Sequence, residues 1–256
     1  EGESMPTFLG LDQDVGDVDI AVLSLPYELT TSYGQGTAEG PRACLEASAQ
    51  VELYDERLGE DLPAGLCIHT IPEWDGQEPT LLQQLDSMTG YLAPWFQGDC
   101  FPLCLGGEHG ILPSIMEAAR HHPLVENDLS NLTVVQIDAH GDLREELDGE
   151  IHSHACAAAR ALDAGIGALY QVGIRAFSKE EHERMMDDSR ITTFFAKDTQ
   201  SPCDGASHWS KWLETLSAMK GPVHLTLDID GLDGSLVPAT GTPVPEGITL
   251  ENGKKL

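Results

Sequence analysis

Basic side chains are scarce in this sequence, which has 14 Lys and Arg against 43 Asp and Glu and a formal charge of −29. That imbalance repels phosphate groups and excludes nucleic acids and anionic membrane surfaces as partners. A solvated acidic surface, as in salt-adapted proteins, explains the charge. We favour that explanation over a negative field that attracts a small cationic substrate, although the two interpretations are compatible.

Targeting and membrane-spanning segments are also missing from the printed sequence. No basic-then-apolar stretch opens it, and no apolar run approaches the length that a bilayer requires. The 6 Cys form no C-x-x-C pair and stand mostly in apolar runs, which is typical of reduced packing residues. We therefore expect a cytoplasmic protein.

One glycine-rich segment, TTSYGQGTAEG at 30–40, lacks the G-x-x-x-x-G-K-[ST] pattern of a P-loop, and no adjacent Lys could bind phosphate. We expect it to line the mouth of a site and to lead into a helix near Pro41, because proline suits a first helical turn.

The rest of the chain alternates short apolar runs with segments of helical spacing. We predict strands within 18–25, 66–71, 101–105, 134–142, 168–174, 191–195 and 223–233, and helices within 80–96, 112–120, 156–165 and 180–187. A further helix carries Trp209, Trp212, Leu213 and Leu216 at core spacing. This order predicts an α/β fold in which a mostly parallel sheet has helices on both faces. We see no domain boundary within 1–256 and expect a single domain.

The stretch VVQIDAHGD at 134–142 is the most informative one. Its apolar run is typical of a buried parallel strand, and Asp138, His140 and Asp142 follow at every second position. If the extended geometry continues, all three side chains point the same way from the carboxyl end of the strand, where α/β proteins bind ligands. An acidic loop with a solvated His140 is the alternative, and this stretch alone does not decide between them.

Two other strand ends offer similar side chains. VHLTLDIDGLD at 223–233 places Asp228 and Asp230 at alternate positions, with Asp233 just beyond, and PLCLGGEHG at 102–110 ends near His109. Clustered buried carboxylates repel one another unless cations are present. Oxygen and imidazole donors without thiolate favour Mn²⁺ over a structural Zn²⁺, and the number of acids indicates two ions.

His152 and His154 begin a helix of small residues, in the sequence HSHACAAARALDAG. They are surface residues at a helix start, or one of them is a proton donor beside the metals, because His titrates near neutral pH. Asp148 and Glu150 are candidates to orient that donor.

Together, GGEH, DAHGD, LDIDGLD and GTPVPEG resemble the motifs of the ureohydrolase family of arginases and agmatinases, in the same order and spacing. The segment SLPYELTTSYGQGTAEGPRACLEASAQVELYDE is more similar to the agmatinase branch than to arginase. The resemblance covers nearly the whole chain. It implies the three-layer arginase-like fold, and against that fold the printed sequence lacks a carboxyl-terminal strand within the sheet and its helices. We accordingly expect either a fragment or an altered terminus, with an unpaired gap in the sheet.

The resemblance also implies a dimanganese site. One Mn²⁺ would be held by His109, Asp138, Asp142 and Asp228, and the other by Asp138, His140, Asp228 and Asp230. The resemblance further implies that Asp142 and His154 are catalytic residues, with His154 in the position of the family's proton-donating histidine. Hydroxide bridging the metals attacks the guanidinium carbon in this scheme.

For the substrate, the resemblance implies agmatine, which is cleaved to putrescine and urea in polyamine biosynthesis. Arginase, guanidinobutyrase and formimidoylglutamase activities are alternatives, and an inactive metal-binding subunit is an alternative of another class. The family commonly forms homotrimers or homohexamers.

Several positions depart from the family pattern. Gly110 replaces a Ser after the metal-binding histidine, and Gly234 replaces a Pro after Asp233, which we expect to loosen that loop. Glu251 stands one position before the carboxylate that binds the guanidinium in the family, and we assign it as a candidate substrate contact. His152 is a second candidate substrate contact. Asp233 is predicted to support the metal ligands from behind.

Overall fold

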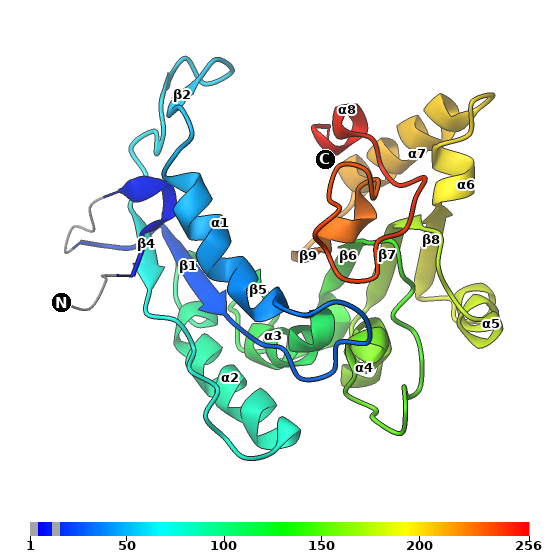
Figure 1. The fold of residues 1–256 in the computed structure, drawn as a ribbon, viewed down its shortest axis with the longest axis horizontal. Helices are drawn as coiled ribbons and strands as arrows, with labels where there is room; N and C mark the ends of the chain where they lie inside the picture. The colour runs from blue at the N-terminus through cyan, green and yellow to red at the C-terminus, as the bar shows by residue number, and fades with distance from the viewer. Residues whose placement is uncertain (1–4, 12–15, 256) are drawn as a thin grey trace. The chain divides into compact units, whose positions relative to one another are not determined.

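A computed structural model describes residues 5–11 and 16–255. The chain divides into two compact units, which we call unit 1 (Glu1–Leu29 with Gly36–Pro123) and unit 2 (Thr30–Gln35 with Leu124–Leu256). Each unit is described by itself, and the single domain expected from the sequence stays a prediction. Figure 1 gives the element labels used below.

Unit 1 is built on a parallel three-stranded sheet in the order β4-β1-β5. Its strands are β1 (Ile20–Leu25), β4 (Ile68–Ile71) and β5 (Phe101–Gly106), and its helices are α1 (Gly40–Ser48), α2 (Leu81–Phe96) and α3 (Leu112–Ala119). The central strand β1 is the most apolar, and Ala21, Val22, Leu23 and Leu25 are fully buried. Thr80 caps α2 by accepting a hydrogen bond from the N–H of Gln83, which confirms the predicted start of this helix.

A short antiparallel hairpin of β2 (Tyr54–Asp55) and β3 (Glu60–Asp61) also belongs to unit 1. The sequence analysis missed it because strands of two residues carry no measurable periodicity. Its turn is held by Asp55, whose carboxylate accepts hydrogen bonds from the N–H groups of Arg57 and Leu58.

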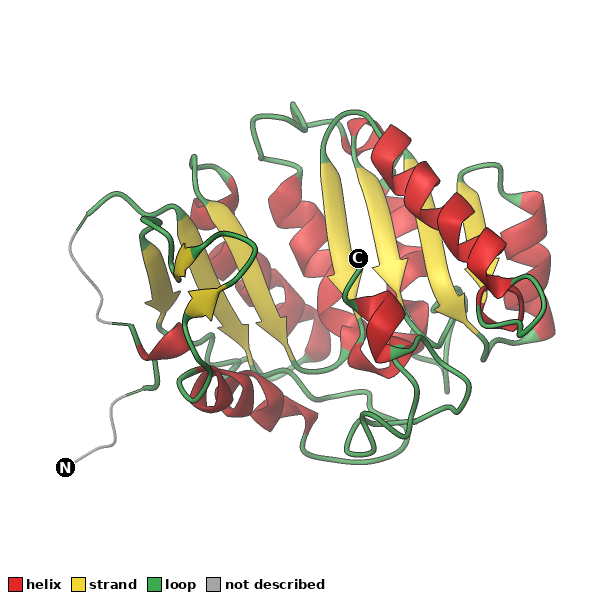
Figure 2. Cartoon of the chain, turned by 90° about the horizontal axis from the view of Figure 1, so that it is seen from above, coloured by secondary structure: helices red, strands yellow, loops and turns green. Residues whose placement is uncertain are grey.

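Unit 2 contains a parallel four-stranded sheet in the order β8-β7-β6-β9. The strands are β6 (Thr133–Ile137), β7 (Ala168–Ile174), β8 (Ile191–Phe195) and β9 (Val223–Leu227). The helices are α4 (Ala157–Ala164), α5 (Lys179–Asp187), α6 (Ala196–Thr199), α7 (Gly205–Ala218) and α8 (Leu250–Gly253). Figure 2 shows helices in front of this sheet and behind it, as the sequence predicts.

The main core of unit 2 lies between α7 and one face of the sheet. Trp209 and Trp212 pack against Val135, Ile137, Val172 and Phe194 of the three strands β6, β7 and β8. This packing confirms that the tryptophan stripe is a core element. Strand β9 is at the sheet edge, where Val223, Leu225 and Leu227 are 45%, 56% and 53% exposed.

Single 3₁₀ turns connect many of these elements. They are η1 (Phe8–Gly10), η2 (Thr37–Glu39), η3 (His109–Ile111), η4 (Leu129–Asn131), η5 (His154–Cys156) and η6 (Ile229–Gly231). Three of them, η3, η5 and η6, carry residues that the sequence analysis assigned to the site.

All 6 cysteines are free thiols, as predicted. The packing role is wrong for Cys44 and Cys203, which are exposed, because both stand on helix or turn surfaces that face solvent. Among the described residues, no helix has both the length and the apolar character needed to cross a bilayer.

Candidate metal centre

Asp138, His140 and Asp230 of unit 2 form a compact group at the carboxyl ends of two neighbouring strands. Strands β6 and β9 pair in parallel, with Ile137 opposite Leu227, so the residues that follow them meet at one sheet edge. One ligand atom from each of the three side chains lies within 4.8 Å of the others. Both carboxylates are buried, with Asp138 1% exposed and Asp230 3% exposed.

The imidazole of His140 lies between these two carboxylates. Its Nδ1 is 3.0 Å from Oδ2 of Asp230 and 3.6 Å from Oδ1 of Asp138. Burial alone lowers the pKa of His140, but the hydrogen bonds and negative charges of Asp138 and Asp230 outweigh it and raise the pKa to about 11. The two carboxylates thus make the position of His140 favourable for positive charge.

Backbone groups fix the position of both carboxylates. The N–H of Ala139 donates to Oδ1 of Asp230 at 3.0 Å, and the N–H of His140 donates to Oδ1 of Asp138 at 2.7 Å. Gly231 allows η6 to approach β6 closely, because a Cβ at this position would stand 2.9 Å from the backbone nitrogen of Asp138. The sequence D-x-D-G therefore serves the close approach of two ligand-bearing segments.

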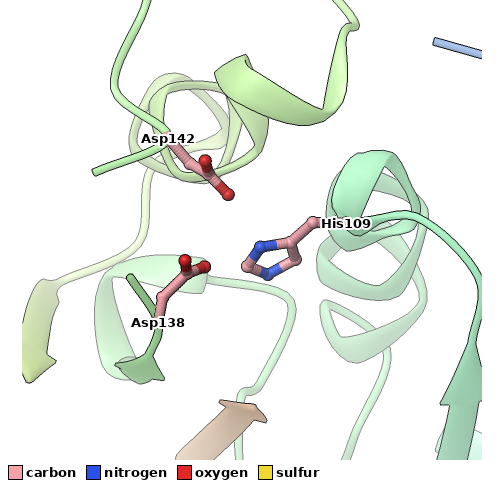
Figure 3. A group of neighbouring side chains, drawn as sticks. All are labelled: His109, Asp138 and Asp142. Atoms are coloured by element: carbon pink, nitrogen blue, oxygen red, sulfur yellow. The ribbon is translucent and has the colours of Figure 1, made fainter. Parts of the chain in front are cut away.

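Asp142 stands beside Asp138, but it does not get there by the predicted alternation along a strand. Strand β6 ends at Ile137, and Asp142 has a left-handed backbone with φ 51°. The prediction of a continued extended geometry is therefore wrong. The turn nevertheless brings the carboxylate of Asp142 to that of Asp138, and Figure 3 shows the two pointing toward one another.

His109 belongs to unit 1, where it begins η3 directly after β5. The turn before it packs tightly on the segment after β1: Gly107 donates its N–H to the carbonyl of Leu25, and Glu108 donates its N–H to that of Tyr27. A Cβ at Gly107 would lie 2.1 Å from the carbonyl oxygen of Tyr27, so this position requires glycine. The Gly-Gly turn thereby fixes where His109 leaves the sheet of unit 1.

Asp228 plays a different local role from the other acids. It is the N-cap of η6, and its Oδ1 accepts a hydrogen bond from the N–H of Asp230 at 3.1 Å. In the part of the chain that the structure describes, it is not a member of a group of ligand atoms within 4.8 Å. Its assignment as a bridging ligand stays a prediction.

His154 begins η5 and is surrounded by hydroxyl groups. Its backbone N–H donates to Oγ1 of Thr30 at 2.9 Å, and its Nδ1 lies 3.3 Å from the hydroxyls of Thr30 and Ser153. Its Nε2 lies 3.5 Å from Oγ of Ser32. Sequence reasoning missed both Thr30 and Ser32, although it assigned their glycine-rich segment to the mouth of the site.

The other predicted site residues have local partners. Glu150, a candidate to orient the proton donor, accepts a hydrogen bond from the backbone N–H of His152. The Nδ1 of His152 is buried and has no hydrogen-bond partner among the described residues. Glu251 is exposed on α8 and pairs with Lys255 at 3.1 Å. The substrate contacts assigned to His152 and Glu251 stay predictions.

Arg175, which sequence reasoning missed, holds together the loops behind Asp230. Its guanidinium donates to backbone carbonyls on both sides: those of Gly173, Asp230, Gly231, Leu232, Val244 and Pro245. Burial lowers the pKa of Arg175. The only sequence signal is an arginine placed directly after the buried strand β7.

Asp233 also supports this loop system. Its carboxylate accepts hydrogen bonds from the side chain and backbone of Ser235 and from the N–H of Gly247, and these bonds lower its pKa to about 2. The expected loosening at Gly234 is wrong, because its N–H donates to the carbonyl of Val244 at 3.3 Å, a bond that proline could not make.

Comparison with known proteins agrees with this architecture. The family model described as "Arginase family" matches residues 18–256. The chain is 35% identical to the N(1)-aminopropylagmatine ureohydrolase of Synechocystis sp. over 241 residues. This aligned region covers 93% of this chain and 75% of that protein. It is 30% identical to the agmatinase of Bacillus cereus, over 97% of this chain and 80% of that protein.

A solved structure gives the same result. The agmatine ureohydrolase of Thermoplasma volcanium superposes with a TM-score of 0.75 at 26% identity, covering 93% of this chain and 76% of that one. The chain belongs to the arginase family of three-layer α/β proteins. Within that family it falls in the agmatinase branch, and it is a hydrolase that acts on C–N bonds of amidines.

This family depends on two metal ions, and the residues of unit 2 fit such ions. Asp138 and Asp230 offer buried oxygen donors, and His140 offers a half-buried nitrogen donor close to both. The raised pKa of His140 reflects a site that attracts positive charge.

Proposed function

We propose that this protein is a dimanganese amidinohydrolase that hydrolyses agmatine to putrescine and urea. The observation that carries the proposal is the group formed by the buried carboxylates of Asp138 and Asp230 and the half-buried imidazole of His140, in a member of the agmatinase branch. Carboxylate and imidazole donors without thiolate are the ligands that suit Mn²⁺.

The proposed ligand sets follow the motifs. One ion is assigned to His109, Asp138, Asp142 and Asp228, and the second to Asp138, His140, Asp228 and Asp230. The mutual proximity of Asp138 with Asp142, and of Asp138 with His140 and Asp230, supports this division. Asp138 is common to both groups, as a bridging carboxylate must be.

When bound, the two ions supply the Lewis acidity that lowers the pKa of a water molecule toward neutrality. The protein's own groups do the remaining work. The carboxylate of Asp142 would serve as a metal ligand and as a hydrogen-bond acceptor. His154 donates a proton to the leaving amine, and the hydroxyls of Thr30 and Ser153 at 3.3 Å hold its Nδ1 side in place.

The formal charge of −29 suits a polycationic substrate. This favours agmatine over arginine, whose α-carboxylate needs a cationic partner. N(1)-aminopropylagmatine is a second candidate, because the Synechocystis relative at 35% identity is named for its hydrolysis. We also propose a cytoplasmic homo-oligomer, a trimer or hexamer, in keeping with the family.

A urea-release assay across guanidino compounds tests the proposal. We expect urea from agmatine or N(1)-aminopropylagmatine with Mn²⁺ present, and much slower release from arginine and 4-guanidinobutyrate. Rapid urea release from arginine would favour arginase, and rapid release from 4-guanidinobutyrate would favour guanidinobutyrase. Formamide from formimidoylglutamate would favour formimidoylglutamase.

The inactive-subunit alternative needs its own control. Metal content measured on the same sample separates the outcomes, because bound Mn²⁺ without turnover of any of these compounds identifies a metal-binding subunit. Asp138→Asn in parallel should abolish turnover, and retained activity in that variant would contradict the bimetal scheme.

A further inference from the structure

A row of polar side chains crosses the sheet of unit 2 beneath the metal centre. Gln136 of β6 stands opposite Gln171 of β7, and Gln171 stands opposite Thr193 of β8. Both glutamines are 0% exposed, although neighbouring strand positions are apolar. A buried amide without partners costs about 1–3 kcal/mol, so such a row persists only when its members bond to one another.

The side chains in the row form a continuous series of hydrogen bonds. Oγ1 of Thr193 donates to Oε1 of Gln171 at 2.9 Å, and Nε2 of Gln171 donates to Oε1 of Gln136 at 2.8 Å. Nε2 of Gln136 then donates to Oδ2 of Asp138 at 2.9 Å. The series runs from the far strand β8 to the carboxylate that both proposed metal sites share.

The carboxylate of Asp138, the last acceptor in the series, determines the direction of every hydrogen bond in it. An ionised carboxylate only accepts hydrogen bonds, so Gln136 must turn its NH₂ toward Asp138 and its oxygen toward Gln171. Gln171 must then present its NH₂ to Gln136 and its own oxygen to Thr193. The hydroxyl of Thr193 is left to donate, and no amide in the series is free to flip.

The same amides hold the backbone of the ligand-bearing turn. Nε2 of Gln171 donates its second hydrogen to the carbonyl of Gly141 at 2.9 Å, and Nε2 of Gln136 lies 3.5 Å from the carbonyl of His140. This turn carries His140 and Asp142. Gln136 and Gln171 therefore contact both the carboxylate of Asp138 and the turn that presents the next two ligands.

We propose that Gln136, Gln171 and Thr193 are positioning residues of the metal centre, which orient the Asp138 carboxylate and the 140–142 turn for divalent cations. This inference rests on the proposed function, since it assigns a role toward the proposed Mn²⁺ ions. Apolar side chains of similar volume would fill the same space without needing these hydrogen bonds, so packing alone does not account for the row.

The closing experiment uses Thr193, the residue farthest from Asp138 along the series. Thr193→Val removes the hydroxyl and keeps the shape, whereas Thr193→Ser keeps the hydroxyl. Thr192→Val is the matched control, because it makes the same change one position away on the exposed side of β8. Gln136→Met, next to Asp138, is the strongest variant.

Titration calorimetry of metal-stripped proteins with Mn²⁺, well below their unfolding temperatures, gives the readout. Residues that orient metal ligands typically contribute 10–100-fold in affinity, so we expect Gln136→Met to raise the Kd for Mn²⁺ by about that factor. Thr193→Val should raise it by a smaller but measurable factor, and Thr193→Ser and Thr192→Val should match the wild type. A merely structural role would lower the unfolding temperature of Thr193→Val and leave its Kd unchanged.

The outcomes are distinguishable. If the wild type binds Mn²⁺ and Thr193→Val binds it equally well, the positioning role is overturned while the proposed function stands. If Thr193→Ser weakens binding as much as Thr193→Val, the hydroxyl is not the cause and the inference also fails. If the wild type itself binds no Mn²⁺, the proposed function fails first. Should Gln136→Met not fold, the Thr193 and Thr192 variants still decide the question.

Discussion

Nδ1 of His140 lies 3.0 Å from Oδ2 of Asp230, which joins the turn after β6 to the turn after β9. The two residues come from strands that are neighbours in space and distant in sequence. Their contact makes the carboxyl edge of this sheet a site for positive charge, supplied either by the histidine proton or by a metal ion.

Asp138→Asn should abolish the stabilisation that Mn²⁺ gives the wild-type protein. An ion that binds only the folded state at 100 times its Kd adds about 2.7 kcal/mol to the free energy of unfolding, which raises the melting temperature. Differential scanning calorimetry with and without Mn²⁺ checks this. Glu183→Gln, an exposed change on α5, is the control and should keep the full Mn²⁺-dependent shift. A shift of wild-type size in Asp138→Asn would show that the ions bind elsewhere.

His154→Ala should lower kcat by about 10²–10⁴-fold, the range typical of a lost general acid, with the Mn²⁺ content unchanged. Steady-state kinetics with metal analysis on the same preparation measures both quantities. His208→Ala, which removes an exposed imidazole near Asp204, should be neutral. Loss of metal together with activity in His154→Ala would make this histidine a structural or ligating residue instead.

Arg175→Met should reduce the free energy of unfolding of the metal-free protein by about 2–5 kcal/mol, because several backbone carbonyls around η6 lose their donor. Denaturant unfolding followed by circular dichroism gives this value. Lys179→Met removes an exposed cation that pairs with Glu183 on the same helix, and should change the free energy of unfolding by less than about 0.5 kcal/mol. Equal stability of the two variants would contradict the role assigned to Arg175.

The lowered pKa of Asp233 leads us to expect that the free energy of unfolding depends on pH in the acid range. Hydrogen bonds from Ser235 and Gly247 lower its pKa from the usual 3.8 to about 2, so the ionised form is favoured in the folded state. Its contribution is therefore fully present above the unfolded-state value and is lost as the pH falls through about 2. The stability difference between wild type and Asp233→Asn should shrink across this interval in acid titrations of the unfolding free energy. A difference that is constant from neutral pH to pH 2 would contradict this account.

Sequence reasoning succeeded where one physical signal dominates. Strands β7 and β8 begin and end at the predicted residues, because both are rich in the β-branched and aromatic side chains that favour strands. The acids Asp138 and Asp230 meet because parallel neighbouring strands end at the same sheet edge. These outcomes need only periodicity and topology.

It failed where geometry depends on single backbone angles or on long-range polar contacts. The left-handed backbone of Asp142 and the 3₁₀ turn η6 (Ile229–Gly231) replace the simple alternation that the residue spacing indicates. Arg175 donates to backbone carbonyls of η6 and of a later loop, and Gln136 accepts a hydrogen bond from Gln171 on the neighbouring strand β7. Their partners depend on which segments become neighbours, and their own sequence context does not specify that.

The central claim is that carboxylates and imidazoles from separate strand ends hold a pair of cations. Anomalous diffraction at the manganese edge, from crystals of the Mn²⁺-loaded protein, tests it most directly. The account predicts two manganese peaks that share Asp138 as a ligand, one of them also bound by His140 and Asp230. A single peak, or peaks that do not contact Asp138, would contradict it.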